Sequence, residues 1–206
     1  LRALCDRAGA VLVFDEVQTG FRIALGGAQS VVGVRPDLTC FGKALSAGYP
    51  VSAVGGRADI MSLIADRRVL QAGTYNTNPV GLAATAANLA VLREPGCFEQ
   101  MAQLSRRLRT GIAEIVAPLG GYVQGSTTVF GVAFGPGPIA NMRDGWRNDP
   151  PRVMEFKREL RIRGIYTKPT PRDIWYLSTA HDEAHVDHTI DVAAEAAAAM
   201  AASAPA

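Results

Sequence analysis

The feature that most constrains the fold is a short, uninterrupted apolar run that ends in two carboxylates. Residues 10–17 read AVLVFDEV and follow Gly9, which closes a helix-like opening segment. A run of this kind predicts a strand buried on both faces, as in a parallel sheet between layers of helices. Two further short runs, at 38–41 and 51–54, are bounded by glycine and proline turn signals and predict more strands of the same sheet. The first part of the chain is therefore expected to be α/β.

Helical patterns separate these strands and continue beyond them. A helix is expected at 59–64, and another at 80–92, where Asn78 can cap the first turn and Pro79 can occupy it. Glu94-Pro95-Gly96 then interrupts the pattern, which predicts one domain over residues 1–94 and a second over 95–206. The second domain is expected to hold helices near 98–116, 153–163 and 183–202 and strands near 121–134, 165–168 and 174–178. This order predicts a small α+β domain after the α/β part.

Composition excludes several classes of protein. The chain has 206 residues, of which 48% are hydrophobic and 19% charged, and its formal net charge is +2. These values exclude a disordered chain and give no support to binding of nucleic acid. No stretch reaches the roughly 18 apolar residues of a membrane span, so no membrane partner is expected. Cys5, Cys40 and Cys97 show no CxxC spacing, which favours a reducing, cytoplasmic location over a disulfide framework.

Asp15 and Lys43 form the first candidate site. Each is expected just after a strand of the sheet, and ligands of open α/β sheets bind beyond the carboxyl ends of strands. Small and apolar residues surround Lys43, so we expect its amine to be partly desolvated and its pKa to be lowered. A lysine of that kind is a nucleophile, and the sequence offers only Lys157 and Lys168 as other lysines. Taken alone, Asp15 could also be a helix cap or an ion-pair partner of Arg22 or Arg35, and Lys43 could be a solvated surface lysine.

Three motifs together carry a resemblance to a known family. FDEVQTGFR, FGKALSAGYPVSAVGG and AGTYNTNP, in this order, resemble the class III aminotransferases, fold-type I enzymes that use pyridoxal 5′-phosphate (PLP). Within that class, the stretch from TGFR to ADIM and the segment YLSTAHDEAHVDHTIDVA are similar to the glutamate-1-semialdehyde 2,1-aminomutases. The resemblance implies the C-terminal part of the large PLP-binding domain, followed by the small C-terminal domain. It also implies that the phosphate-binding loop and the ring-stacking aromatic lie upstream of Leu1, so we expect a C-terminal half whose folding and cofactor binding depend on the rest.

The resemblance assigns roles around the cofactor. It implies that Lys43 forms the internal aldimine, a Schiff base, and that Asp15 pairs with the protonated pyridine nitrogen, which lets the ring accept electrons. Val17 would pack on the ring face, and Gln18 would lie near the ring hydroxyl. The aminomutases usually carry an apolar residue at the position of Gln18, whereas glutamine is common in ordinary class III transaminases. Intermolecular transamination between amine or amino-acid and carbonyl substrates, and the intramolecular aminomutase reaction in tetrapyrrole precursor synthesis, therefore both stay open.

Two further assignments follow from the same resemblance. Gly73 and Thr74 match the residues that bind the cofactor phosphate of the partner subunit, which implies a homodimer with shared active sites. Asp173 aligns with an acidic residue near the active-site entrance, where it could contact substrate; beside Arg172 it could also be an ordinary surface residue.

Two readings compete with the PLP enzyme. His181, His185 and His188 are spaced by four and three residues, which would place them on one helical face and could suggest a metal-dependent hydrolase. HDEAH does not have the glutamate position of the zinc-protease motif HExxH, and Asp182 and Glu183 suit the start of a helix, so a hydrated helix face is preferred and no metal is expected. The other alternative is a non-catalytic domain that only dimerises.

Overall fold

Two units, Leu1–Phe98 and Glu99–Ala206, make up the chain in the computed structural model, which describes residues 1–171 and 174–203. The division falls at the start of helix α5 (Cys97–Val116), shortly after the Glu94-Pro95-Gly96 interruption. The functional assignment of the two domains remains a prediction. Each unit has its own three-stranded sheet.

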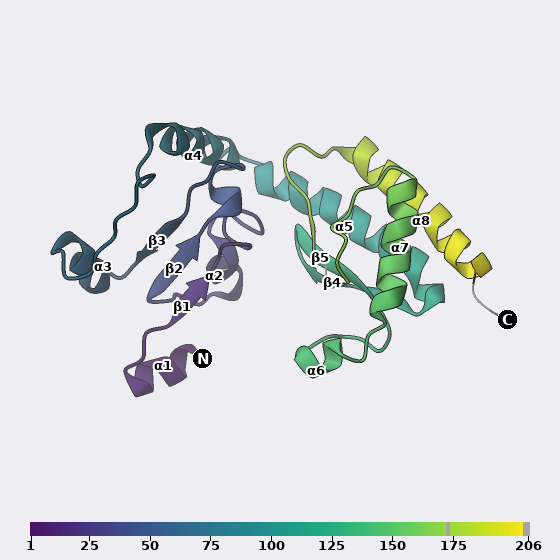
Figure 1. Ribbon diagram of the computed structural model, residues 1–206, viewed down its shortest axis with the longest axis horizontal. Helices are drawn as coiled ribbons and strands as arrows, with labels where there is room; N and C mark the ends of the chain where they lie inside the picture. The colour runs from purple at the N-terminus through teal and green to yellow at the C-terminus, as the bar shows by residue number, and fades with distance from the viewer. Residues whose placement is uncertain (172–173, 204–206) are drawn as a thin grey trace. The chain divides into compact units, whose positions relative to one another are not determined.

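The first unit combines one sheet with four helices and a short 3-10 turn, coloured purple to blue-green in Figure 1. Its helices are α1 (Arg2–Ala8), α2 (Gly27–Val32), α3 (Ala58–Ala65) and α4 (Pro79–Leu92), and the turn is η1 (Lys43–Leu45). Its strands are β1 (Val13–Asp15), β2 (Leu38–Phe41) and β3 (Ala53–Gly56), in the order β1-β2-β3. Strand β1 runs parallel to β2, and β3 runs antiparallel to β2, so β1 and β2 end at the same edge of the sheet.

Local sequence signals explain several element ends. Gly9 ends α1 in the left-handed region, with φ at 62°, where a glycine has no steric penalty. The side chain of Asn78 accepts a hydrogen bond from the backbone nitrogen of Gly81, and Pro79 is the first residue of α4. The predicted cap and start of this helix are confirmed.

The prediction of a strand buried on both faces is wrong for β1. The strand has three residues, and Val11 and Val13 are 52% and 49% exposed. β1 is an edge strand of a small sheet, so part of its apolar surface has no covering layer. Among the described residues of the first unit, only Pro36, Leu45 and Leu92 have buried apolar side chains larger than a methyl group.

Because the first unit buries few apolar side chains, a buried carboxylate that joins four of its segments is important for its structure. Asp37, 5% exposed, precedes β2 and accepts a hydrogen bond of 2.7 Å from the backbone nitrogen of Leu12. It also forms ion pairs with Arg2 of α1 at 2.7 Å and with Arg57, after β3, at 3.0 Å. The bond from Leu12 and the two guanidinium groups hold the pKa of Asp37 well below its usual value. Asp37 therefore ties the opening helix and all three strands together.

The second unit is an α+β structure with an antiparallel sheet. Its helices are α5, α6 (Met142–Gly145), α7 (Pro150–Ile162) and α8 (Glu183–Ser203), with a 3-10 turn η2 (Ala117–Leu119). Its strands are β4 (Gly121–Ser126), β5 (Val129–Phe134) and β6 (Trp175–Tyr176), in the order β4-β5-β6. The expected strand at 174–178 is thus present in part, whereas the strand expected at 165–168 is wrong, because that segment follows α7 as irregular chain.

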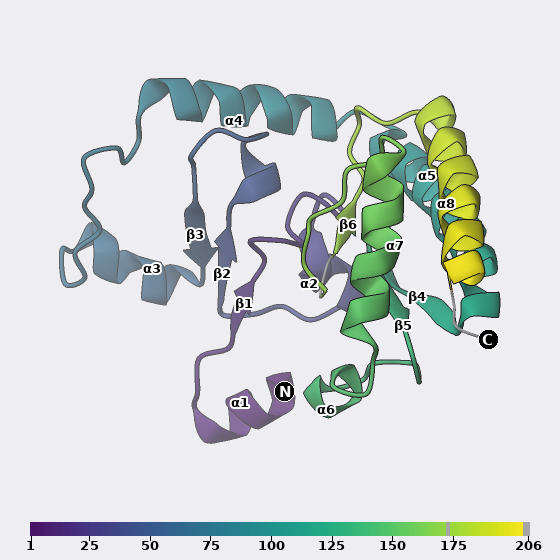
Figure 2. The same ribbon diagram turned by 45° about the vertical axis from the view of Figure 1, so that its right-hand side comes forward.

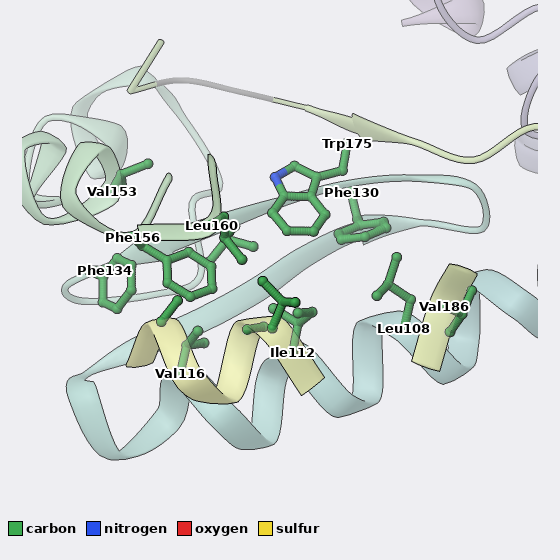
Figure 3. Close-up of a cluster of buried hydrophobic side chains, with 14 of the residues drawn as sticks. Leu108, Ile112, Val116, Phe130, Phe134, Val153, Phe156, Leu160, Trp175 and Val186 are labelled. Atoms are coloured by element: carbon green, nitrogen blue, oxygen red, sulfur yellow. The ribbon is translucent and has the colours of Figure 1, made fainter. Parts of the chain in front are cut away.

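Helices α5, α7 and α8 lie around the sheet of this unit (Figure 2), and apolar residues from these helices and the sheet form one core (Figure 3). Ile112, Val116 and Leu160 are fully buried. Two aromatic contacts cross the core: Phe130 lies 5.5 Å from Trp175 and Phe134 lies 5.9 Å from Phe156, between ring centroids. Within the described part of the chain, no helix combines the length and apolar character needed to cross a bilayer.

Candidate active site at the ends of β1 and β2

The carboxyl ends of β1 and β2 bring Asp15 and Lys43 to the same edge of the sheet. Asp15 is the last residue of β1 and pairs in register with Cys40 of β2. Lys43 follows β2 directly after Gly42. Both side chains are exposed. Asp15 and Lys43 therefore lie where the sequence predicted, at the ends of two neighbouring strands.

Val17 lies beside both Asp15 and the glycine that precedes Lys43. Its backbone nitrogen donates a hydrogen bond of 3.0 Å to Oδ1 of Asp15. Its Cγ1 would lie 3.5 Å from a Cβ atom placed on Gly42, the residue before Lys43. The loop after β1 thus packs against the beginning of the lysine turn, and Val17 presents an apolar surface there.

Lys43 occupies a tight turn with an unusual backbone. Its φ is +44°, in the left-handed region that a non-glycine residue rarely adopts. Leu45 anchors the turn, since it is 5% exposed, and Ser46 donates a hydrogen bond of 2.5 Å to the carbonyl of Tyr49. From α4, Nδ2 of Asn88 donates to the carbonyls of Ala44, at 2.7 Å, and Leu45, at 3.1 Å. The predicted desolvation of Lys43 is wrong for this chain, because its side chain is exposed.

Glu16, the residue after Asp15, has a structural role that the sequence analysis missed. Its side chain is 1% exposed. Its Oε2 accepts hydrogen bonds from Thr19 Oγ1 and Ala28 N, both at 2.7 Å, and its Oε1 accepts from Gln29 N at 2.8 Å. A Cβ atom on Gly27, whose φ is +67°, would collide with Oε2. Glu16 therefore caps the first turn of α2 from a distance and fixes the loop that carries Val17.

The remaining predicted residues lie elsewhere or are not described. Gln18 is exposed in the loop after β1. Gly73 and Thr74 are exposed in the loop between α3 and α4, which lies apart from the ends of β1 and β2 in both views (Figures 1 and 2). Asp173 falls outside the described residues.

The histidines do not form the single helical face that their spacing suggested. His181 precedes α8, which begins at Glu183, and its Nδ1 lies 3.2 Å from the backbone nitrogen of Ser178. Nδ1 of His185 lies 2.6 Å from Asp182 Oδ1. The backbone nitrogen of His185 donates a hydrogen bond to the same oxygen, and this bond lowers the pKa of the Asp182 carboxyl. Over residues 1–171 and 174–203, no group of three or more His, Cys, Asp or Glu side chains could hold a metal ion. The contacts of His181 and His185 belong to the turn that starts α8.

Comparison with known proteins connects this geometry to a family. Residues 1–180 match the family described as Aminotransferase class-III. A glutamate-1-semialdehyde 2,1-aminomutase from Desulforudis audaxviator is 42% identical over 199 residues, which cover 95% of this chain and 46% of that protein. A second protein of the same name, from Thermomicrobium roseum, is 40% identical over 204 residues. The chain spans about half the length of the curated relatives it matches.

Solved structures share the fold. An omega-transaminase from Sphaerobacter thermophilus superimposes with a TM-score of 0.84 at 33% identity, over 96% of this chain and 46% of that one. The PLP internal aldimine form of the FumI protein of Sphingopyxis sp. MTA144 gives a TM-score of 0.81 at 27% identity, over 98% of this chain and 46% of that one. The predicted fold class, the C-terminal part of a PLP-dependent transferase of fold type I, is confirmed.

Proposed function

The chain belongs to the class III aminotransferases, and on that premise we propose that it contributes the lysine and the ring-binding carboxylate of a PLP-dependent transaminase. One observation carries the proposal: an exposed amine, Lys43, and an exposed carboxylate, Asp15, leave neighbouring parallel strands at the same edge of the sheet. Ligands of open α/β sheets bind at that edge. The substrates would be a small amine or amino acid and a carbonyl compound.

The residues present fit the cofactor. Asp15 accepts one hydrogen bond at Oδ1 from Val17, and its Oδ2 has no hydrogen-bond partner among the described residues, so it can accept from a protonated ring nitrogen. Val17 offers an apolar surface for the ring, and Gln18 is exposed beside it. Lys43 would hold the cofactor covalently through Nζ. When bound, PLP supplies an electron sink that stabilises negative charge on the substrate carbon.

Lys43 would have a second task after the substrate amine has taken its place. Its released Nζ can remove a proton from the substrate Cα and later return one, as a general base and then a general acid. Asp15 would keep its negative charge beside the ring nitrogen and hold that proton in place. Asn88 and Leu45 support the turn from which Nζ acts.

The other assignments complete this proposal. The exposed Gly73 and Thr74 would bind the cofactor phosphate in the partner subunit of a homodimer, and Asp173 would contact substrate near the entrance. Cys5, Cys40 and Cys97 form no disulfide in the described part of the chain, which agrees with the cytoplasmic location that we propose.

Borohydride reduction after incubation with PLP, followed by peptide mass mapping, tests the proposal on the 206-residue chain and on the complete gene product. The chain has three lysines, which makes the result easy to assign. We expect the adduct at Lys43. Lys168 is exposed and reports non-specific reaction, whereas Lys157 is 4% exposed and is expected to stay unlabelled.

Two variants are matched controls. Lys43→Arg should abolish specific labelling, and Lys168→Arg should leave it unchanged. Labelling of the complete protein but not of the 206-residue chain would show that additional polypeptide is needed for binding. Absence of an adduct at Lys43 in both would contradict the proposed function.

The aminomutase reaction is the second candidate, and the names of relatives at 40–42% identity favour it. Incubation of the complete protein with glutamate-1-semialdehyde and no second carbonyl substrate separates the two reactions. An aminomutase converts the compound to its isomer, whereas a transaminase needs a separate acceptor for sustained turnover. The exposed Gln18 favours the transaminase on the pattern described above.

A further inference from the structure

The turn that carries Lys43 holds an unfavourable backbone conformation. The φ angles of Lys43 and Ala47 are +44° and +51°, and neither residue is a glycine. Left-handed backbone at such residues persists only where the surrounding structure imposes it. The contacts that impose it therefore determine where the lysine amine points.

Within the turn, local hydrogen bonds do not use every backbone carbonyl. The backbone nitrogen of Leu45 bonds to the carbonyl of Gly42 at 2.9 Å, and that of Ser46 bonds to the carbonyl of Lys43 at 3.3 Å. These i to i+3 bonds are those of any short 3-10 turn, and they leave the carbonyls of Ala44 and Leu45 for other donors.

Asn88 supplies these donors from α4. Its Nδ2 lies 2.7 Å from the carbonyl oxygen of Ala44 and 3.1 Å from that of Leu45, across 44 and 43 residues of sequence. An amide NH2 group has two hydrogens, so one side chain can serve both consecutive carbonyls. The side chain is half-buried, which strengthens both bonds relative to a solvated pair.

We propose that Asn88 is a positioning residue for Lys43, because its paired hydrogen bonds to Ala44 and Leu45 fix the strained turn that aims the amine. The inference rests on the proposed function of Lys43 and adds a residue that sets how efficiently that lysine captures the cofactor. Asn88 itself does not contact the reacting atoms in this account; it acts through the backbone of the turn.

Two variants at position 88 remove the donors in different ways. Asn88→Asp keeps the shape and replaces the NH2 group with an oxygen, and Asn88→Leu removes both polar atoms. Thr85→Ala is the matched control, since Thr85 lies about one turn earlier on α4 and its hydroxyl donates to the carbonyl of Gly81, at 2.8 Å, rather than to the lysine turn. Two lost hydrogen bonds of ordinary strength predict a roughly 30-fold fall in cofactor capture at Lys43 relative to Lys168.

The measurement is the ratio of borohydride-trapped PLP at Lys43 and Lys168, determined on the complete protein by peptide mapping. Two further readouts separate positioning from loss of folding. Acetylation by succinimidyl acetate, which needs only an exposed amine, should not change at Lys43, and the circular dichroism of the bound cofactor above 320 nm should weaken per mole of adduct. Loss of stability alone would alter the folded fraction without changing the signal per adduct.

Capture at Lys43 equal to the parent in both position-88 variants, or an equal loss in Thr85→Ala, would overturn the inference while leaving the proposed function in place. Absence of an adduct at Lys43 in the parent protein would overturn both. Because Asn88→Asp and Asn88→Leu differ in charge and shape, agreement between them assigns the effect to the lost donors.

Discussion

Replacing Glu16 with glutamine tests how the loop after β1 is held. The substitution preserves size but turns one carboxylate oxygen into an NH2 group. Oε2 accepts from Ala28 N and Oε1 accepts from Gln29 N, so either orientation of the new amide leaves one of these two backbone donors facing another donor. At 1% exposure, water is not available to replace the lost acceptor.

The expected cost follows from these contacts. A buried donor without an acceptor costs about 1–3 kcal/mol, and bonds to a neutral oxygen are about half as strong as bonds to a carboxylate. Together these effects predict a loss of about 3 kcal/mol in the local stability of the α2 first turn. Since tenfold corresponds to about 1.4 kcal/mol, amide hydrogen exchange at Ala28 and Gln29 should accelerate by roughly 150-fold.

Hydrogen exchange resolved to the first turn of α2 is the assay, with Thr19→Val as a control. That variant removes one hydroxyl donor to Glu16 and leaves its contacts with Ala28 and Gln29, so it should accelerate exchange by about fivefold, the equivalent of about 1 kcal/mol. Tryptophan fluorescence, which reports only the second unit, should not change. Exchange in Glu16→Gln within about threefold of the parent would refute the reasoning.

Three other perturbations have defined outcomes. Ile112→Ala should destabilise the second unit by about 3 kcal/mol, and Ile112→Val by about 1 kcal/mol, in urea unfolding followed by the fluorescence of the buried Trp175. Asp37 has a lowered pKa, so its stabilisation is present above its ordinary value of 3.8 and is lost as pH falls below it; Asp37→Asn should flatten this acid dependence in unfolding followed by far-UV circular dichroism. Lys157 is buried, and Nζ donates to the carbonyls of Lys168 and Thr170 at 3.0 and 2.6 Å; Lys157→Met should loosen this segment by about 2 kcal/mol, measured as faster amide exchange at Thr167, Lys168 and Thr170.

The sequence was most informative where a local signal is sufficient to determine a structure. Gly9 ended α1 and Asn78-Pro79 began α4 as predicted, because a left-handed glycine and a capping side chain act within a few residues. The short apolar runs identified β2 and the parallel pairing of β1 with it for a similar reason: each run ends at a recognisable turn. The placement of Asp15 and Lys43 at one edge of the sheet then followed from topology.

Long-range polar contacts were not predictable in the same way. Glu16 caps α2 across a loop, and Asn88 reaches the lysine turn from a helix whose apolar composition gave no reason to single it out. One signal for the first contact was present: α2 begins at Gly26-Gly27, which has no capping side chain of its own, so a carboxylate from elsewhere was needed. The strand expected at 165–168 failed because an apolar pattern cannot show whether a neighbouring strand is available to pair.

The two units therefore depend on different interactions. The second unit surrounds a continuous apolar core, so its stability should respond mainly to truncation of side chains such as Ile112. The unit that carries Lys43 buries little apolar surface of its own and relies on Asp37, Glu16 and Asn88, each of which connects separate segments. Conservative polar substitutions at these three positions should consequently perturb the candidate site more than removal of an exposed apolar side chain such as that of Val13, even though Val13 lies in the strand that ends at Asp15.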